Sequence, residues 1–241
     1  MLLYKLTIFI IGIFMVSSCG EVYHDIKFPP NRQIAHRGFW RAGATENSVL
    51  AVQYAINANL YGAEVDVYET IDGVIIVNHD ANCNGFNLST SLYYDIDSKC
   101  DVPTLEDFLS ILRNNANFKL VIEIKFVHDV MSILRLIDKY QIHDQIEFLS
   151  FNRLFCEAII QANPKYRVGY LGDDLTPQYL YDNGYDIINS SYNVYLRNPE
   201  IIRESQNLGL DVYTWTVNDA KIMSLMYDMG VQLITTDLPR I

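Results

Sequence analysis

Eight short apolar segments, separated by longer helical stretches, most strongly constrain the fold of this chain. The segments are rich in β-branched residues and occupy 33–36, 63–69, 119–125, 146–151, 167–171, 186–190, 211–217 and 233–236. Helices are expected between them, near 47–60, 104–114, 129–140, 152–162, 176–183, 198–208 and 218–229. Continuously apolar strands that alternate with helices indicate a parallel sheet covered on both faces. We therefore predict an α/β fold, a single (β/α)8 TIM barrel, with a doubly wound open sheet as the alternative.

The expected helices begin and end at residues that can cap them. The expected N-caps are Asn47, Thr104, Asn152, Thr176 and Asn198, whose side chains can accept hydrogen bonds from the first turn. Gly184, Gly209 and Gly230 follow three of the helices, where a left-handed residue is favoured. Both signals support the predicted helix boundaries.

A hairpin is expected directly after the second strand. Residues 74–77 are apolar and follow Asp72-Gly73, a dipeptide that favours a tight turn between antiparallel strands. Residues 81–101 are rich in Asn, Ser and Asp and are expected to form a loop. The predicted barrel therefore carries a small hairpin and loop insertion after its second strand.

The N-terminus has the pattern of an export signal. Lys5 precedes an apolar run over residues 6–16, which is too short to span a bilayer about 30 Å thick. The ending Val16-Ser17-Ser18-Cys19 resembles the cleavage site of bacterial lipoproteins, after which Cys19 carries the lipid. We expect a lipoprotein signal peptide (1–18), a tether (19–31) and one domain (32–241). The protein is then exported and lipid-anchored to a bacterial cell membrane, on its periplasmic or surface side; an ordinary signal peptide or an uncleaved anchor is the alternative.

Three cysteines remain after Cys19. Cys83 and Cys100 lie 17 residues apart around a polar stretch and can form a disulfide in an oxidising compartment. Cys156 lies in an apolar helical stretch and is expected to be buried. Because no two of the three have a close metal-ligand spacing, a zinc site is not expected.

The charge balance argues against one class of partner. The 241 residues include 18 Lys and Arg against 29 Asp and Glu, for a formal net charge of −11, and no basic run occurs. Nucleic-acid binding through a basic face is therefore not expected. A phosphate ligand would have to meet a local arginine or a metal ion.

Polar residues gather where the predicted strands end, which is where barrel enzymes build their active sites. The group comprises His36, Arg37, Glu64, Asp66, His79, Glu123, Lys125 and Trp215. Strand alternation places Glu64 and Asp66 on one face of the second strand. Glu123 and Lys125 share one face of the third strand in the same way.

Three carboxylates in this group predict a metal site. Inward-facing Glu64, Asp66 and Glu123 are costly to bury unless they pair or bind a cation. An all-oxygen donor set suits one hard divalent cation, Ca²⁺ or Mg²⁺. A cation beside Arg37 and Lys125 would hold a phosphodiester, and two histidines would supply an acid and a base.

An ordered set of short motifs runs from residue 34 to residue 239. The motifs are Ile34-Ala35-His36-Arg37-Gly38, Thr45-Glu46-Asn47-Ser48, Gly62-Ala63-Glu64-Val65-Asp66-Val67, Thr70-Ile71-Asp72-Gly73, His79-Asp80, Pro103-Thr104-Leu105, Glu123-Ile124-Lys125, Trp215-Thr216-Val217-Asn218 and Thr236-Asp237-Leu238-Pro239. Each motif is weak by itself, but the ordered set resembles the glycerophosphodiester phosphodiesterase family. The resemblance covers nearly the whole chain after the expected tether.

The resemblance implies a TIM-barrel hydrolase that cleaves small-molecule glycerophosphodiesters to sn-glycerol 3-phosphate and an alcohol. It also implies roles for individual residues: His36 and His79 as the acid/base pair; Glu64, Asp66 and Glu123 as metal ligands; Arg37 and Lys125 on the phosphate; Glu46 beside the first histidine and the metal; and Trp215 as a pocket wall. The implied mechanism is attack by the neighbouring substrate hydroxyl, which forms a cyclic phosphate that water then opens.

Two other functions are compatible with the sequence. The first is a phosphatidylinositol- or lysolipid-cleaving phospholipase of the same fold, which a lipid anchor would hold near its substrate. The second is a non-catalytic barrel that binds a phosphodiester. Retention of both histidines and of all three carboxylates favours the phosphodiesterase, whereas the alcohol released and the choice between Ca²⁺ and Mg²⁺ stay open.

Overall fold

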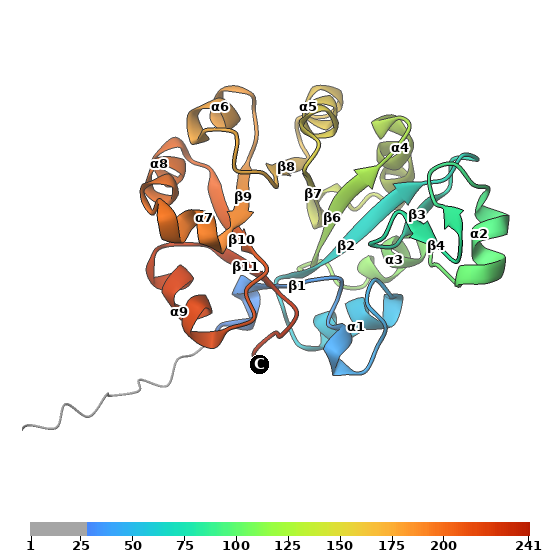
Figure 1. Ribbon diagram of the computed structural model, residues 1–241, viewed down its shortest axis with the longest axis horizontal. Helices are drawn as coiled ribbons and strands as arrows, with labels where there is room; N and C mark the ends of the chain where they lie inside the picture. The colour runs from blue at the N-terminus through green and yellow to red at the C-terminus, as the bar shows by residue number, and fades with distance from the viewer. Residues whose placement is uncertain (1–27) are drawn as a thin grey trace, which may run out of the picture.

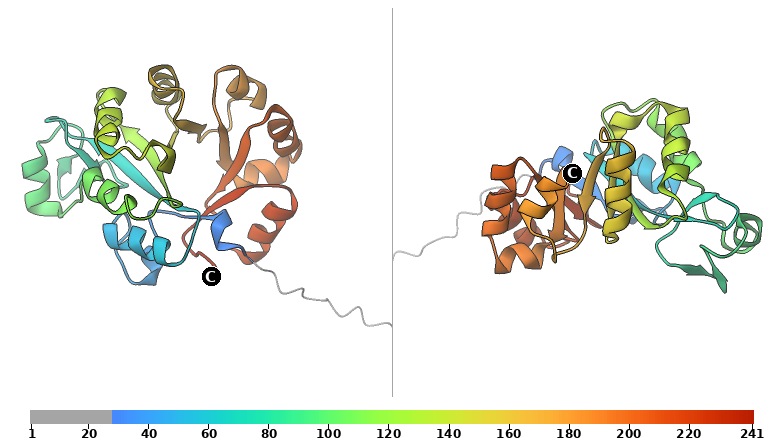
Figure 2. Two further views of the ribbon diagram at one scale, coloured as in Figure 1. Left: turned by 180° about the vertical axis from the view of Figure 1, so that it is seen from behind. Right: turned by 90° about the horizontal axis from the view of Figure 1, so that it is seen from above.

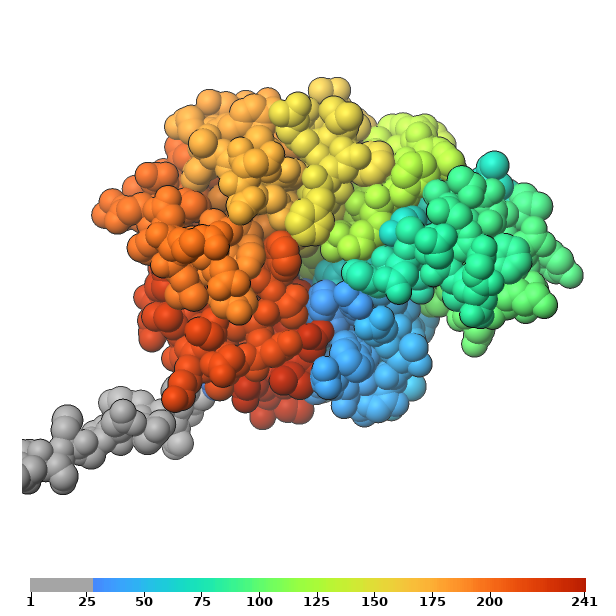
Figure 3. Space-filling view, in the orientation of Figure 1, coloured from blue at the N-terminus to red at the C-terminus, as the bar shows by residue number. Residues whose placement is uncertain are grey.

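Residues 28–241 are described by the computed structural model, and within them eight parallel strands close into a barrel (Figure 1). The barrel strands are β1 (Gln33–Ala35), β2 (Gly62–Glu69), β6 (Lys119–Phe126), β7 (Ile146–Ser150), β8 (Arg167–Tyr170), β9 (Ile187–Ser191), β10 (Asp211–Trp215) and β11 (Leu233–Thr236). β1 pairs with both β2 and β11, which closes the sheet. Figure 3 accordingly shows the blue N-terminal part of the barrel next to the red C-terminal part. The predicted (β/α)8 barrel is confirmed, and the open-sheet alternative is wrong.

The predicted signal peptide (1–18), Cys19 and residues 20–27 of the predicted tether lie outside the described residues. The last part of that tether, residues 28–31, lies against the barrel. Phe28 packs on the outer core, and Gln33 Nε2 donates a hydrogen bond of 3.3 Å to the Pro29 carbonyl. From residue 28 onward, no helix is both long enough and apolar enough to cross a membrane.

Helices surround the barrel, as Figure 2 shows from two further sides. The predicted ones are observed as α1 (Val49–Asn57), α3 (Leu105–Leu112), α4 (Val130–Tyr140), α5 (Arg153–Ala162), α6 (Pro177–Asp182), α8 (Glu200–Leu208) and α9 (Ala220–Asp228), and short 3-10 turns occur at η1 (Pro30–Arg32), η2 (Trp40–Ala42) and η3 (His143–Gln145). Their buried apolar residues pack on the outward faces of the strands in one continuous core. This core, typical of a (β/α)8 barrel, holds the strand ends in place around the site.

Two of the predicted N-caps are wrong. Asn47 has a left-handed backbone with a φ of 55°, and its side chain bonds to Asp66, so Ser48 caps α1 instead. Asn198 ends α7 (Tyr192–Arg197), a short helix that the sequence pattern does not reveal, and Pro199 stands at the N-cap of α8. The other three stand at N-caps as predicted, and Gly184, Gly209 and Gly230 all have positive φ.

The barrel interior is filled beneath the site. An apolar layer crosses it, formed by Ile34, Val121, Leu149, Leu171, Ile187, Tyr213 and Leu233. Nearer the N-terminal ends of the strands, buried Glu147 pairs with Arg167 at 3.2 Å between Oε1 and Nε. The polar residues at the C-terminal ends therefore face a cleft with a closed floor.

The predicted hairpin after the second strand is confirmed, but the predicted loop over residues 81–101 is wrong. β3 (Ile75–Val77) returns antiparallel to β2. The following residues form a small hairpin, β4 (Asn82–Cys83) with β5 (Phe86–Asn87), and the helix α2 (Tyr93–Cys100). This insertion projects from the side of the barrel (Figures 1 and 2). The insertion is mostly polar in composition, which is why the sequence predicts a loop. A few of its apolar side chains, among them Leu88 and Ile96, are nevertheless buried in a small separate core, the satellite core.

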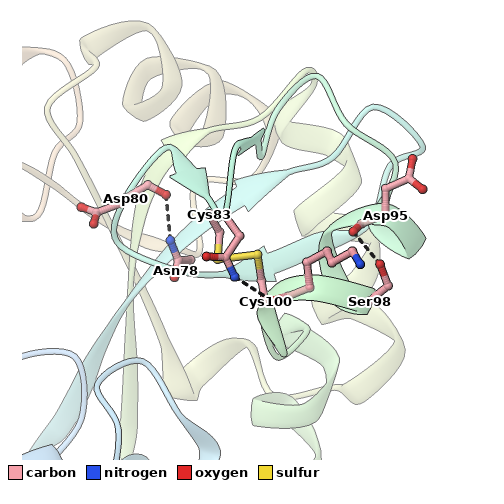
Figure 4. The surroundings of a disulfide bond; sticks show 8 residues. Asn78, Asp80, Cys83, Asp95, Ser98 and Cys100 are labelled. Atoms are coloured by element: carbon pink, nitrogen blue, oxygen red, sulfur yellow. Dashed lines mark hydrogen bonds between the residues drawn. A yellow bond between two sulfur atoms is a disulfide. The ribbon is translucent and has the colours of Figure 1, made fainter.

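A disulfide joins Cys83 to Cys100 and ties β4 to the end of α2 (Figure 4). The structure thus forms the pairing that the sequence allows but does not decide. Cys156 is free and buried on α5, as expected, and burial raises the pKa of its thiol to about 12. Its environment is that of an inert core residue.

Candidate active site

A tight turn after β1 brings the first strand's polar residues to the mouth of the barrel. Arg37 and Gly38 both have positive φ, 55° and 79°. A Cβ atom at Gly38 would lie 2.6 Å from the Cβ of Ala51, so α1 can pack this closely only against glycine. The turn directs the Arg37 backbone N–H to Glu64 Oε2, at 2.9 Å.

Three buried carboxylates meet at the mouth of the barrel. Glu64 and Asp66 alternate on β2, and Asp66 stands opposite Glu123 in the β2–β6 register. One oxygen from each of the three lies within 4.8 Å of the others. Burial, and then the charges of Asp66 and Glu123, raise the pKa of Glu64 well above its usual range. The structure thus brings the three predicted ligands together at a cost in charge repulsion.

Two cations lie beside the carboxylates. Lys125 Nζ is 2.6 Å from Glu123 Oε1 and 3.1 Å from Asp66 Oδ1. Arg37 Nε lies 3.8 Å from Asp66 Oδ2, while its Nη1 donates at 3.1 Å to Glu46 Oε2. Glu46 is thus placed against Arg37 at the half-exposed rim. Both predicted phosphate-binding cations reach the mouth of the barrel.

The donor set fits a divalent cation. Glu64 Oε1 is buried and has no hydrogen-bond partner among the described residues. Hard divalent cations take carboxylate oxygens, and one such ion would offset the charge that Lys125 and Arg37 leave uncompensated on three carboxylates. Glu64, Asp66 and Glu123 are therefore the residues that can hold it.

His36 follows β1 and is oriented by Asp237 at the end of β11. Its Nδ1 lies 2.7 Å from Asp237 Oδ1. Although partial burial opposes ionisation, hydrogen bonds from His36 and Asn218 lower the pKa of Asp237 to about 2. An ionised carboxylate accepts, so Nδ1 of His36 carries the proton. Nε2, which lies 4.0 Å from Glu64 Oε2, is then the nitrogen free to exchange a proton.

His79 follows β3 and reaches the site from the hairpin. Its Nδ1 lies 2.8 Å from Oδ1 of Asp80, which is 80 % exposed, whereas Asp237 is only 18 % exposed. His36 and His79 line one cleft of about 190 Å³, together with Glu64, Glu123 and Lys125. The structure therefore places both predicted histidines in the same cavity as Glu64 and Glu123.

Trp215, at the end of β10, lines the same cleft. Its ring meets that of Phe151 edge to face, with centroids 5.5 Å apart, and its Nε1 donates to the Asn189 carbonyl at 3.2 Å. The indole is thereby fixed on the side of the barrel opposite the carboxylates. This position suits the predicted pocket wall.

Two supporting residues were not predicted. Asn47 Nδ2 donates to Asp66 Oδ2 at 2.8 Å, and its Oδ1 accepts from the Asp66 N–H at 3.1 Å. Asp237 is the other; Asn218 Nδ2 donates to its Oδ2 at 2.7 Å. The sequence signal for Asp237 was its place at the end of the eighth strand, which neighbours the first. Asn47 gave no such signal, because its position just before a helix suggested a helix cap.

The fold and the site together define an enzyme of the phosphoric diester hydrolase class. Comparison with known proteins specifies it further: the chain belongs to the glycerophosphoryl diester phosphodiesterase family, whose sequence model matches residues 36–241. A glycerophosphodiester phosphodiesterase of Bacillus altitudinis is 25 % identical over 234 residues, covering 85 % of this chain and 94 % of the relative.

Solved structures agree. A glycerophosphodiester phosphodiesterase from Parabacteroides distasonis superimposes with a TM-score of 0.83 at 30 % identity, covering 87 % of this chain and 94 % of that one. An Oleispira antarctica phosphodiesterase, solved in complex with the product sn-glycerol-3-phosphate, has the same fold with a TM-score of 0.77 at 18 % identity, covering 86 % and 93 %. The barrel is thus that of the family.

Proposed function

We propose that this protein is a glycerophosphodiester phosphodiesterase that requires Ca²⁺ or Mg²⁺ and releases sn-glycerol 3-phosphate and an alcohol. The observation that carries the proposal is the convergence of two histidines, Glu64, Glu123 and Lys125 on one cleft of about 190 Å³, with Asp66 clustered against the two glutamates. Family membership supports the same activity. The product bound by the Oleispira antarctica relative supports glycerol 3-phosphate as the product here.

The cation would be held by Glu64, Asp66 and Glu123. When bound, it would neutralise the negative charge of the phosphate as the reaction proceeds. Lys125 and Arg37 stand beside these carboxylates and would bind the remaining phosphate oxygens. This geometry supports the predicted division between metal ligands and phosphate-binding cations.

His36 and His79 act as the acid/base pair in the proposed reaction. One ring removes the proton of the hydroxyl neighbouring the phosphate, whose oxygen forms a new bond to phosphorus. The bond from phosphorus to the alcohol oxygen breaks, and the other ring protonates that oxygen. Water then opens the resulting cyclic phosphate with the two roles reversed. The proton on Nδ1 of His36, held by Asp237, leaves its Nε2 for this exchange.

We also propose that the protein is exported and anchored by lipid on Cys19. The pattern of residues 1–19 supports this proposal, as does a disulfide between Cys83 and Cys100, a bond typical of oxidising compartments. Replacement of Cys19 by serine is expected to move the protein from the membrane fraction to the soluble fraction of the producing cell. Retention in the membrane by the Cys19→Ser variant would contradict lipid anchoring.

The activity is tested by measuring glycerol 3-phosphate release from a panel of glycerophosphodiesters with Ca²⁺, Mg²⁺ or EDTA. We expect EDTA, His36→Ala and His79→Ala each to abolish turnover. His143→Ala is the matched control, because His143 pairs with Asp138 away from the cleft. Release from lysolipids alone would favour the phospholipase alternative, and no turnover by folded, metal-loaded protein would favour the binding-only barrel.

A further inference from the structure

Asn189 lies on the inner face of β9 and has no part in the proposed chemistry. Ile187, two residues earlier, belongs to the apolar layer of the barrel interior, whereas Ile188 packs outward against the helices. Strand alternation therefore points Asn189 inward, one layer above Ile187. It lines the same cleft as His36 and Glu64.

The carboxamide of Asn189 is buried without a partner. The residue is 1 % exposed, and neither its Nδ2 nor its Oδ1 has a hydrogen-bond partner among residues 28–241. Leu149, Leu171 and the ring of Trp215 share the cleft lining, and they offer it nothing polar except the indole N–H, which is donated to the Asn189 backbone carbonyl. Buried polar groups are almost always satisfied, so a group left open in a cleft indicates a ligand that satisfies it.

The position of Asn189 separates it from the phosphate-binding side. In the closed strand order, β9 stands four strands from β2 in either direction, so it lies across the barrel from the strand that carries Glu64 and Asp66. The Asn189 side chain is also uncharged, so it would not neutralise a phosphate. Because phosphate oxygens only accept hydrogen bonds, a phosphate would leave the Asn189 Oδ1 acceptor without a partner. A carboxamide with a free N–H and a free C=O matches a hydroxyl, which both donates and accepts.

We propose that Asn189 binds the terminal hydroxyl of the glycerol moiety and makes the site specific for glycerol. This inference rests on the proposed function and deepens it. The hydroxyl next to the phosphate is used in the attack and must lie near the histidines and the cation. The terminal hydroxyl is the one that extends across the cleft toward β9.

The test compares wild type and an Asn189 variant on two substrates, one with the terminal hydroxyl and one without it. The substrate analogue carries a methyl group in place of the terminal CH₂OH, so it keeps the hydroxyl that attacks. We expect the wild-type kcat/KM to fall by about 10²-fold or more on the analogue. Asn189→Leu, of similar volume, is expected to lose a similar factor on the glycerol substrate and little on the analogue. Asn193→Leu, at an exposed position of α7, is the matched control and should behave as wild type.

Thermal unfolding distinguishes binding from a structural role. Because Asn189 makes no side-chain hydrogen bond within the described part of the chain, Asn189→Leu should leave Tm unchanged or raise it. A lowered Tm, or an equal loss of kcat/KM on both substrates, would overturn the proposal.

Binding measurements separate this inference from the proposed function. Calorimetry compares sn-glycerol 3-phosphate with propane-1,2-diol 1-phosphate on the metal-loaded wild type and Asn189→Leu. We expect the wild type alone to prefer glycerol 3-phosphate. If no glycerophosphodiester is turned over but this preference holds, the proposed function fails and the role of Asn189 stands. If turnover is normal and both proteins bind the two ligands alike, only the role of Asn189 fails.

Discussion

His36 Nδ1 lies 2.7 Å from Asp237 Oδ1, and this contact joins the first strand of the barrel to the last. The two residues are 201 positions apart in the chain. They meet because β1 pairs with β11, with Ala35 opposite Thr236. The closure of the barrel therefore also orients one of the two histidines of the site.

Asp237→Asn is expected to lower kcat strongly, because the amide N–H can donate to Nδ1 and favour the wrong tautomer of His36, and a neutral amide no longer stabilises the protonated ring. A loss on the order of 10⁴-fold is expected, by analogy with other carboxylate-oriented histidines. Asp80→Asn should cost far less, since Asp80 is 80 % exposed and its contact with His79 is screened by solvent. The kcat of both variants and their pH profiles test this order, and an equal loss in the two would contradict it.

Asn47→Gly is expected to weaken metal binding about 10- to 100-fold, because it removes the two hydrogen bonds that orient Asp66. Glycine keeps the left-handed backbone that Asn47 adopts, so the change isolates the side chain. Asn59→Gly is the matched control, since Asn59 has a similar φ of 53° on the exposed surface. Titration with Ca²⁺ and Mg²⁺ measures the affinity; equal affinities for the two variants would rule out the orienting role.

Removing the disulfide with Cys83→Ala and Cys100→Ala is expected to destabilise the folded chain. The bond closes a loop of 17 residues in the sequence, for which the stabilisation is about 3 kcal/mol. Thermal unfolding should show a lower Tm in the double variant. Dithiothreitol should lower the Tm of the wild type toward that of the double variant and leave the variant unchanged. Insensitivity of the wild type to reductant would count against a stabilising bond.

The Asp237 carboxylate is expected to stabilise the fold above its unfolded pKa of 3.8 and to lose that contribution as pH falls through about 2. Its lowered pKa means that the unfolded state binds the proton first, so acid favours unfolding. The shift corresponds to about 2 kcal/mol. Denaturant unfolding of wild type and Asp237→Asn should therefore differ by this amount near neutral pH and converge near pH 2. A difference that stays constant with pH would contradict the assignment.

Local sequence patterns predict most of this fold and the residue types of the site. Continuous β-branched runs mark each barrel strand to within one or two residues, because they suit strands buried on both faces. Alternation along the second strand places Glu64 and Asp66 on one face, a property of the strand itself. The hairpin after that strand follows from Asp72-Gly73 in the same local way.

Predictions fail where long-range packing outweighs local composition. Residues 93–100 are mostly polar, yet they form α2. Ile96 is buried in the satellite core, and Cys100 forms a disulfide with Cys83. Asn47 resembles a helix cap, but its carboxamide is used by Asp66, 19 residues away. Neither partner lies within the span over which helix and turn signals act.

The sequence by itself determined the barrel strands, most of the helices between them and which strand side chains face inward, because these follow from periodicities of two and 3.6 residues. Only the tertiary structure decided which inward side chains meet. Closure of the barrel brings Asp237 to His36, and the β2–β6 register sets Glu123 beside Asp66. Within residues 28–241, the carboxamide of Asn189 is left buried without a partner. Such contacts depend on strand register and barrel closure, which are set by the packing of the whole chain.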